Sequence, residues 1–162
     1  MSKIVIIGAG AMGSAFALPC LDNNHDINII GTHLEDDFID NLKKNNNLHS
    51  GLNTKIPQEI NIFKFENFEN LLKSNVDMIV LGISSKGIEW VSDQLSKLFK
   101  DKTLPKILML TKGLSIHNNR YELLVDKLER LLKDRKISNA NISAVGGPCL
   151  AAGLANRVHS SV

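Results

Sequence analysis

The stretch that decides the fold runs from Ile4 to Ala17 and reads Ile-Val-Ile-Ile-Gly-Ala-Gly-Ala-Met-Gly-Ser-Ala-Phe-Ala. Its first four residues are β-branched and apolar, which is typical of a strand buried on both faces of a parallel sheet. Three glycines follow in the spacing G-x-G-x-x-G, and the Ala-rich end of the stretch favours a helix. The stretch therefore predicts a strand, a tight turn and a helix in immediate succession.

Each glycine has a separate mechanical role in such a turn. Gly8 lets the chain turn out of the strand, Gly10 leaves the backbone bare for a pyrophosphate, and Gly13 lets the helix press on the sheet. The free N–H groups and the positive dipole end of the helix favour a bound phosphate. We therefore predict a dinucleotide-binding turn. The alternative is a purely structural turn, in which the glycines only allow the chain to change direction.

Length and composition argue against several other classes of protein. The 162 residues suit a single domain, and the net charge of +2 comes from Lys and Arg dispersed among Asp and Glu. The sequence therefore contains no basic patch that would indicate a nucleic-acid partner. The apolar run before Gly8 is too short for a signal peptide or a membrane span. Cys20 and Cys149 show no spacing pattern, which favours free, buried thiols and a cytoplasmic location. We predict no metal site and expect surface or loop positions for four histidines: His25, His49, His117 and His159.

Apolar segments along the chain alternate between strand-like and helix-like patterns, which favours a parallel sheet with helical crossovers. The fold class that we predict is α/β, a Rossmann-type doubly wound, mainly parallel sheet with helices on both faces. Strands are expected at 4–7, 26–30, 60–65, 77–83, 106–111 and 142–145, and helices at 11–23, 38–44, 68–73, 88–99 and 121–132.

Three further segments carry specific expectations. Pro19 lies inside the first helix and should remove one hydrogen bond and bend it. Residues 49–57 are predicted to form an irregular, exposed loop. Residues 158–162 are predicted to begin another extended segment, so we expect the chain to be a piece of a longer protein.

Loops at the carboxyl ends of the predicted strands are rich in Gly, Ser and Thr. In an open α/β sheet, ligands bind beyond these ends, so the loops suit a phosphorylated ligand. The alternative is that they contain ordinary turn residues. The loops lie at 8–13, 31–33, 83–86, 111–114 and 146–149.

The end of the second strand bears on the choice of cofactor. A carboxylate there would hold the adenosine ribose, but the position carries Gly31-Thr32-His33, and acids come only from Glu35 onward. Thr32 and His33 could bind a ribose hydroxyl or a 2′-phosphate. The choice between NAD and NADP stays open.

Lys112 is the most informative single residue. It follows a buried apolar strand and precedes Gly113, a position at which a surface lysine has no special reason to lie. Its ammonium could hold a phosphate or polarise a substrate oxygen. The alternative is a lysine that extends from the sheet into solvent.

Three motifs together resemble the NAD(P)-dependent glycerol-3-phosphate dehydrogenase family. They are Gly8-Ala9-Gly10-Ala11-Met12-Gly13-Ser14-Ala15, Thr111-Lys112-Gly113-Leu114 and Gly147-Pro148-Cys149-Leu150-Ala151. The first motif is shared with many reductases, whereas the other two are more specific. The resemblance covers the whole chain, 1–162, as the dinucleotide-binding (Rossmann) domain of such an enzyme. We expect the helical C-terminal domain of the family to have no counterpart in this chain.

The resemblance implies interconversion of sn-glycerol 3-phosphate and dihydroxyacetone phosphate in glycerophospholipid synthesis, with NAD or NADP as cofactor. No catalytic residue is assigned with certainty, since the family's general-base lysine is expected beyond Val162. Whether the full-length enzyme forms a homodimer stays open. The cofactor residues implied by the motif and its resemblance are Gly8, Gly10, Ala11, Met12, Gly13, Thr32, His33, Lys112 and Ala151. The substrate residues implied are Lys112, Gly147 and Cys149.

Three departures from the family pattern stand out. Ser84 replaces a proline after the fourth strand, Gly153 replaces an acidic residue, and Thr32 replaces Arg or His. Two alternative functions share the glycine motif: a ketopantoate- or hydroxyacid-type reductase, and a nucleotide-sensing module without catalysis. Lys112-Gly113 argues against the reductase, which usually has Asn-Gly at this strand end.

Overall fold

A computed structural model describes residues 1–160 and has one six-stranded sheet at its centre, in which all neighbouring strands run parallel. The order across the sheet is β10-β7-β6-β1-β2-β5. In chain order this is the 3-2-1-4-5-6 arrangement of the doubly wound Rossmann fold, so the predicted fold class is confirmed. The strands are β1 (Lys3–Ile7), β2 (Asp26–Ile30), β5 (Asn61–Phe63), β6 (Met78–Leu81), β7 (Lys106–Met109) and β10 (Ile142–Ala144).

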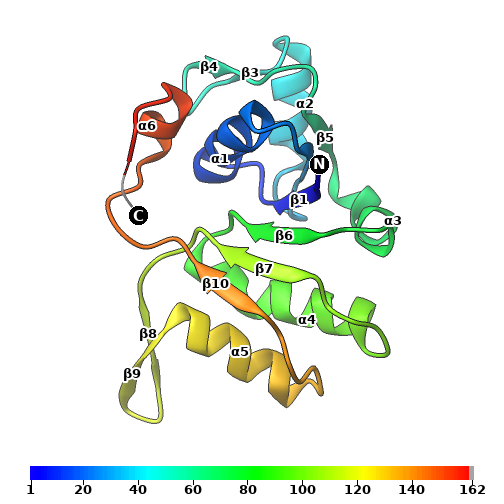
Figure 1. Cartoon of the computed structure of the whole chain (residues 1–162), viewed down its shortest axis with the longest axis vertical. Coiled ribbons are helices and arrows are strands. Elements are labelled where there is room, and N and C mark those ends of the chain that lie inside the picture. Colours follow the sequence, from blue (N-terminus) through cyan, green and yellow to red (C-terminus); the bar gives the residue numbers. More distant parts are fainter. Residues whose placement is uncertain (161–162) are drawn as a thin grey trace.

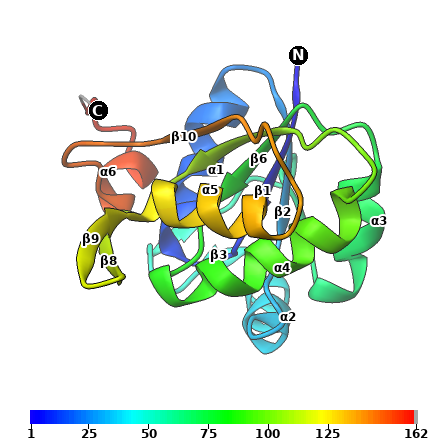
Figure 2. The same cartoon turned by 90° about the horizontal axis from the view of Figure 1, so that it is seen from below.

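Helices cover both faces of the sheet (Figures 1 and 2). Side chains alternate along β1, so Ile4 and Ile6 join the core beneath α1, whereas Val5 and Ile7 join the core beneath α4 and α5. This two-sided burial explains the unbroken apolar run of β1. The helices are α1 (Ala11–Asp22), α2 (Asp36–Lys44), α3 (Phe68–Lys73), α4 (Ile88–Phe99), α5 (Leu124–Asp134) and α6 (Ala151–Ala155).

The segment 49–57 is not the irregular, exposed loop that we expected. It contributes to a short antiparallel ribbon of β3 (Leu48–His49) and β4 (Thr54–Lys55), and His49 is only 2% exposed. Ile56 is fully buried in the core beneath α1. Strands of two residues are too short to show an alternating pattern, which is why the sequence did not reveal them.

A second antiparallel ribbon occupies the region in which the sequence predicted that a helix starts at residue 121. Its strands are β8 (Leu114–His117) and β9 (Arg120–Leu123), and α5 starts only at Leu124. Asn118 and Asn119 join the strands with φ of 49° and 59°, the two left-handed positions of a type I′ hairpin turn. The pair Asn-Asn was therefore a usable turn signal that we missed.

The expected extended run at 158–162 lies partly outside the described residues, and 158–160 form no strand. Pro19 lies inside α1, as predicted. Neither Cys20 nor Cys149 forms a disulfide within the described part of the chain, and both are half-buried. Across residues 1–160, every helix is too short or too polar to span a membrane.

Candidate dinucleotide-binding site

Three glycines bring the first turn, α1 and β6 into direct contact. Gly8 has a φ of +107°, and a Cβ on it would lie 2.6 Å from the Gly82 carbonyl oxygen. A Cβ on Gly13 would lie 2.3 Å from the Gly8 carbonyl oxygen, and one on Gly82 would lie 2.8 Å from the Cα of Gly13. Gly82 was missed by sequence reasoning, although its position directly after the strand beside β1 was a usable signal. The contact occurs between β1 and β6, where the strand order reverses and α/β proteins bind ligands.

Gly10 differs from these glycines because a Cβ on it would meet no close contact. Outside residues 9–11, the described heavy atom nearest to a Cβ built on Gly10 is Glu35 Oε1, at 3.8 Å. Gly10 is the N-cap of α1, and no side chain in residues 1–160 caps this helix end. The first turn also contains no acidic residue, so within residues 1–160 its N–H groups receive no side-chain hydrogen bond, and the Glu35 carboxylate is the nearby acidic group. Bare backbone beside an uncapped helix N-terminus makes an anion site.

A groove of about 630 Å³ extends from Gly10 across the end of β2. Thr32 and His33 both line it, as do Glu35, Lys86 and Trp90. The His33 ring packs 5.0 Å from the Trp90 ring and 6.0 Å from the Phe65 ring, measured between centroids. The structure thus brings the predicted residues Gly10, Thr32 and His33 to one groove, which we call the Gly10 groove.

Glu35 supplies the carboxylate that the sequence did not place at this strand end. Its Oε2 accepts a hydrogen bond of 2.7 Å from the backbone N–H of Thr32. The turn after β2 therefore folds the carboxylate back toward Gly10. Spacing along the sequence could not reveal this return, because it depends on the conformation of residues 32–35.

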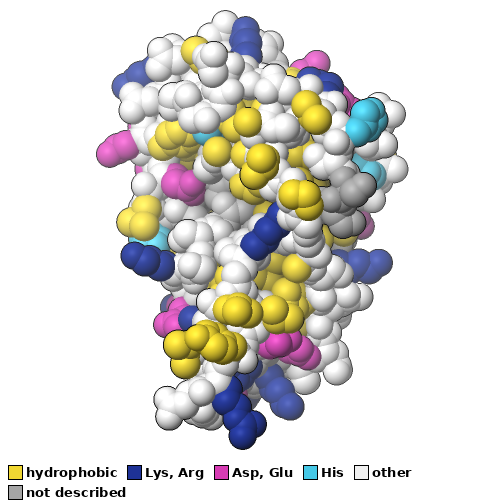
Figure 3. Space-filling view, turned by 90° about the vertical axis from the view of Figure 1, so that its left-hand side faces the viewer, with side chains coloured by type: hydrophobic (Ala, Val, Ile, Leu, Met, Phe, Trp, Pro, Cys, Tyr) yellow, Lys and Arg dark blue, Asp and Glu magenta, His cyan; other side chains and the backbone are white. Residues whose placement is uncertain are grey.

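The second group of predicted residues lies at the ends of β7 and β10. Lys112 Nζ donates a hydrogen bond of 2.6 Å to the Gly147 carbonyl oxygen and lies 3.5 Å from the Cys149 carbonyl oxygen. The ammonium therefore joins two neighbouring loops, and the Lys112 side chain is at the same time exposed to solvent. Thr111 Oγ1 ties the same loop to the Ile83 carbonyl oxygen at 2.6 Å. Because the sheet is parallel, these loops leave it at the same edge as the Gly10 groove, and Figure 3 looks onto this side of the molecule.

Ala151 begins α6, which packs against α1 on the same side of the sheet. An ion pair joins the end of α1 to the segment just after α6: Arg157 donates to both carboxylate oxygens of Asp22, at 2.8 and 2.9 Å. These hydrogen bonds lower the pKa of the Asp22 carboxyl below its ordinary value. Ala151 is therefore held beside the helix that starts at the glycine turn, although it follows that turn by more than a hundred residues.

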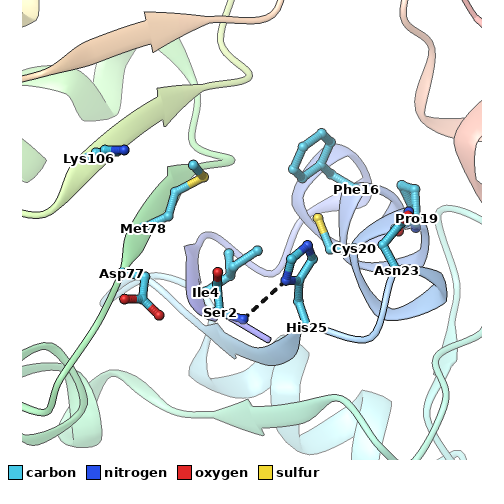
Figure 4. A pocket seen from close by; sticks show the side chains of 10 residues that line it. All are labelled: Ser2, Ile4, Phe16, Pro19, Cys20, Asn23, His25, Asp77, Met78 and Lys106. Carbon is cyan, nitrogen blue, oxygen red and sulfur yellow. Dashed lines mark hydrogen bonds between the residues drawn. The ribbon is translucent and has the colours of Figure 1, made fainter.

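A second cavity, of about 710 Å³, lies at the opposite edge of the sheet (Figure 4). Residues of α1, including Cys20, face Met78 across it, and Ser2 donates its backbone N–H to His25 Nδ1 at 3.3 Å. Burial raises the pKa of the Cys20 thiol to about 11, so the thiol stays protonated and unreactive at neutral pH. The cavity opens at the amino ends of the strands, away from the edge at which this fold binds ligands.

Comparisons with known proteins agree with this geometry. A family model described as NAD-dependent glycerol-3-phosphate dehydrogenase N-terminus matches residues 3–162. An NADP(+)-dependent glycerol-3-phosphate dehydrogenase from Archaeoglobus fulgidus is 29% identical over 159 residues, covering 98% of this chain and 45% of that protein. A glycerol-3-phosphate dehydrogenase [NAD(P)+] from Fusobacterium nucleatum is 29% identical over 151 residues, covering 91% of this chain and 41% of that protein.

Among solved structures, the glycerol-3-phosphate dehydrogenase from Coxiella burnetii matches 96% of this chain with a TM-score of 0.76 and 20% identity. The match covers 43% of that chain, and its low identity supports the fold alone. This chain spans less than half the length of the curated relatives named above. Because the family model matches residues 3–162, nearly the whole chain, the chain belongs to the NAD-dependent glycerol-3-phosphate dehydrogenase family and corresponds to the N-terminal part of its members.

Proposed function

We propose that this chain binds NAD(H) or NADP(H) as the cofactor-binding domain of an enzyme that interconverts sn-glycerol 3-phosphate and dihydroxyacetone phosphate. The observation that carries the proposal is the uncapped N-terminus of α1 beside Gly10, on which a Cβ would meet no close contact. A side chain at position 10 would occupy the space that a pyrophosphate needs. The N–H groups of Ala11 and Met12 have no partner within the helix and would donate to the phosphate oxygens.

The Gly10 groove would hold the adenosine half of the cofactor. Thr32 and Glu35 offer polar atoms for the ribose hydroxyls, and His33 with Trp90 offers aromatic surface. The groove contains both a carboxylate, on Glu35, and an ammonium, on Lys86. Since these charges act in opposite directions on a 2′-phosphate, NADH and NADPH both belong in the binding measurements.

The bound nicotinamide would supply a hydride to the C2 carbonyl of dihydroxyacetone phosphate, or accept one from the corresponding carbon of sn-glycerol 3-phosphate. Lys112 would hold the substrate through its phosphate or its C2 oxygen, exchanging its bond to the Gly147 carbonyl for the substrate. Gly147 and Cys149 would border the substrate, and Ala151 the cofactor. The proton of the C2 hydroxyl would be moved by a lysine beyond Val162, in the helical domain that the family resemblance implies.

Titration of NADH fluorescence against the purified chain tests the first half of the proposal. We expect saturable binding, weaker than that of a two-domain enzyme, and no steady-state oxidation of NADH with dihydroxyacetone phosphate. Absence of saturation at millimolar NADH and NADPH would overturn the assignment as a cofactor domain. Turnover by the chain alone would overturn the assignment of the base to another domain.

Two lysines at opposite ends of β7 provide a matched test of the substrate side. Lys112→Ala removes the ammonium at the ligand edge, whereas Lys106→Ala removes one at the far edge. We expect dihydroxyacetone phosphate to tighten NADH binding in the wild type and in Lys106→Ala, but not in Lys112→Ala. The same response in both variants would contradict the role of Lys112. Ketopantoate serves as the competing substrate, and a response to it alone would favour the reductase alternative.

A further inference from the structure

His49 lies in the core beneath the glycine turn, although the sequence suggested an exposed loop. The side chain comes from the β3–β4 ribbon, and its ring packs 5.0 Å from the Phe38 ring. Its Nε2 atom lies 3.2 Å from the carbonyl oxygen of Ala9, forty positions away in the sequence. Ala9 is the first variable residue of the G-x-G-x-x-G turn, so His49 contacts the backbone that the proposed function depends on.

The contact identifies which ring nitrogen is the donor. A carbonyl oxygen can only accept, so Nε2 carries the hydrogen and donates it to Ala9. The other ring nitrogen, Nδ1, is buried and has no hydrogen-bond partner within residues 1–160. A phenylalanine would fill a similar space without burying an unpaired nitrogen. Packing alone therefore does not favour a histidine here, and the donated hydrogen bond is what the imidazole adds.

The Ala9 carbonyl shares its peptide unit with the N–H of Gly10. The unit is planar and trans, so the carbonyl and the N–H point in opposite directions. Ser14 Oγ donates to the same carbonyl at 2.9 Å, from the first turns of α1. The two donors hold the carbonyl toward the core beside α1, and the Gly10 N–H is thereby turned the other way.

We propose that His49 is a positioning residue: by holding the Ala9 carbonyl it orients the Gly10 N–H for a dinucleotide pyrophosphate. The proposal rests on the proposed cofactor function. It predicts that the hydrogen bond matters for ligands with a pyrophosphate and not for adenosine, which reaches only the Gly10 groove. A role in packing alone would affect stability without this distinction.

Two amide variants of His49 test whether a donor must reach the Ala9 carbonyl oxygen. Gln places its amide nitrogen near the position of Nε2, whereas Asn is one methylene shorter and cannot reach Ala9. We expect His49→Gln to bind NADH and ADP within about twofold of the wild type. His49→Asn and His49→Phe should bind both ligands about three- to tenfold more weakly, which is the effect of one hydrogen bond. Binding of adenosine, followed by NMR titration, should be unchanged in all three.

His25→Phe is the matched control, because His25 lies at the opposite edge of the sheet beside the second cavity. It should leave the dissociation constants of NADH and ADP unchanged. Equal NADH affinity in His49→Asn, His49→Phe and the wild type would overturn the positioning role. Equal weakening of adenosine and NADH would also overturn it, since a general loss of packing predicts that result. If the wild type does not bind NADH, the proposed cofactor function is wrong. If the wild type binds NADH and His49→Asn and His49→Phe bind it equally well, only the positioning role is wrong.

Discussion

Replacing Gly10 and Gly13 by alanine, one at a time, should separate cofactor binding from stability. The backbone of Gly10 has φ −66° and ψ 177°, a conformation that alanine adopts without strain. Apart from residues 9–11 themselves, its new methyl group would have no heavy atom of the described residues closer than 3.8 Å. Gly10→Ala should therefore leave the free energy of unfolding unchanged or raise it by up to about 1 kcal/mol, because the unfolded chain loses freedom.

Gly13→Ala should behave in the opposite way. Its methyl carbon would lie 2.3 Å from the Gly8 carbonyl oxygen, so α1 must retreat from the turn by about 1 Å to restore ordinary contact. Overpacking of this kind costs about 1–3 kcal/mol, and the better helix propensity of alanine offsets at most about 1 kcal/mol. Because the 2.3 Å contact is with backbone, the cost lies at the upper end of this range and the net loss is about 2 kcal/mol; at about 2–4 °C per kcal/mol, the melting temperature should fall by about 4–8 °C.

Thermal unfolding and NADH titration of the two variants complete the test. Gly10→Ala should keep or raise its melting temperature and weaken NADH binding at least about tenfold, a loss of about 1.4 kcal/mol. Gly13→Ala should lose stability whether or not ligand is present. A Gly10→Ala protein that binds NADH as the wild type does would refute the placement of the pyrophosphate against this backbone. A Gly13→Ala protein with unchanged stability would refute the close packing of α1 on the turn.

Three further predictions concern other parts of the molecule. Pro19→Ala restores a donor to the first helix and should stabilise the protein by about 1–3 kcal/mol; an unchanged or lower unfolding midpoint in urea would contradict this. Hydrogen bonds from Arg130 lower the pKa of the Glu122 carboxyl. The ion pair should therefore stabilise the docking of the β8–β9 hairpin on α5 fully at pH values above the ordinary glutamate pKa. This stabilisation should be lost as the pH falls through the lowered pKa of Glu122. Hydrogen-exchange protection of the hairpin at pH 5 and pH 3 measures this, and Glu122→Gln should abolish the pH difference. Cys20, with a pKa of about 11, should be alkylated by iodoacetamide at pH 8 far more slowly than a free cysteine, because about 0.1% of it is thiolate. Equal rates would show that its burial is transient.

The sequence was most informative where local pattern and burial agree. The run 4–7 predicted β1, and residues 26–30 and 68–73 matched β2 and α3 at both ends. A strand buried on both faces must be apolar throughout, and a helix that covers a sheet must repeat its apolar residues every three to four positions. Both requirements are visible within one short window. The same holds for the glycine turn, whose spacing is set by consecutive backbone contacts.

The sequence by itself thus determined the doubly wound sheet, the glycine turn and the loops in which ligand-binding residues were to be sought. Only the tertiary structure decided that Glu35 folds back toward Gly10, that Gly82 closes the turn from β6, and that His49 lies buried on Ala9. Each of these contacts depends on how a turn or a neighbouring element packs, and a two-residue strand such as β3 carries no periodic signal of its own. The physical difference lies in range: backbone propensity and periodic burial act between neighbours in sequence, whereas a hydrogen bond across forty residues exists only once the chain has folded around it.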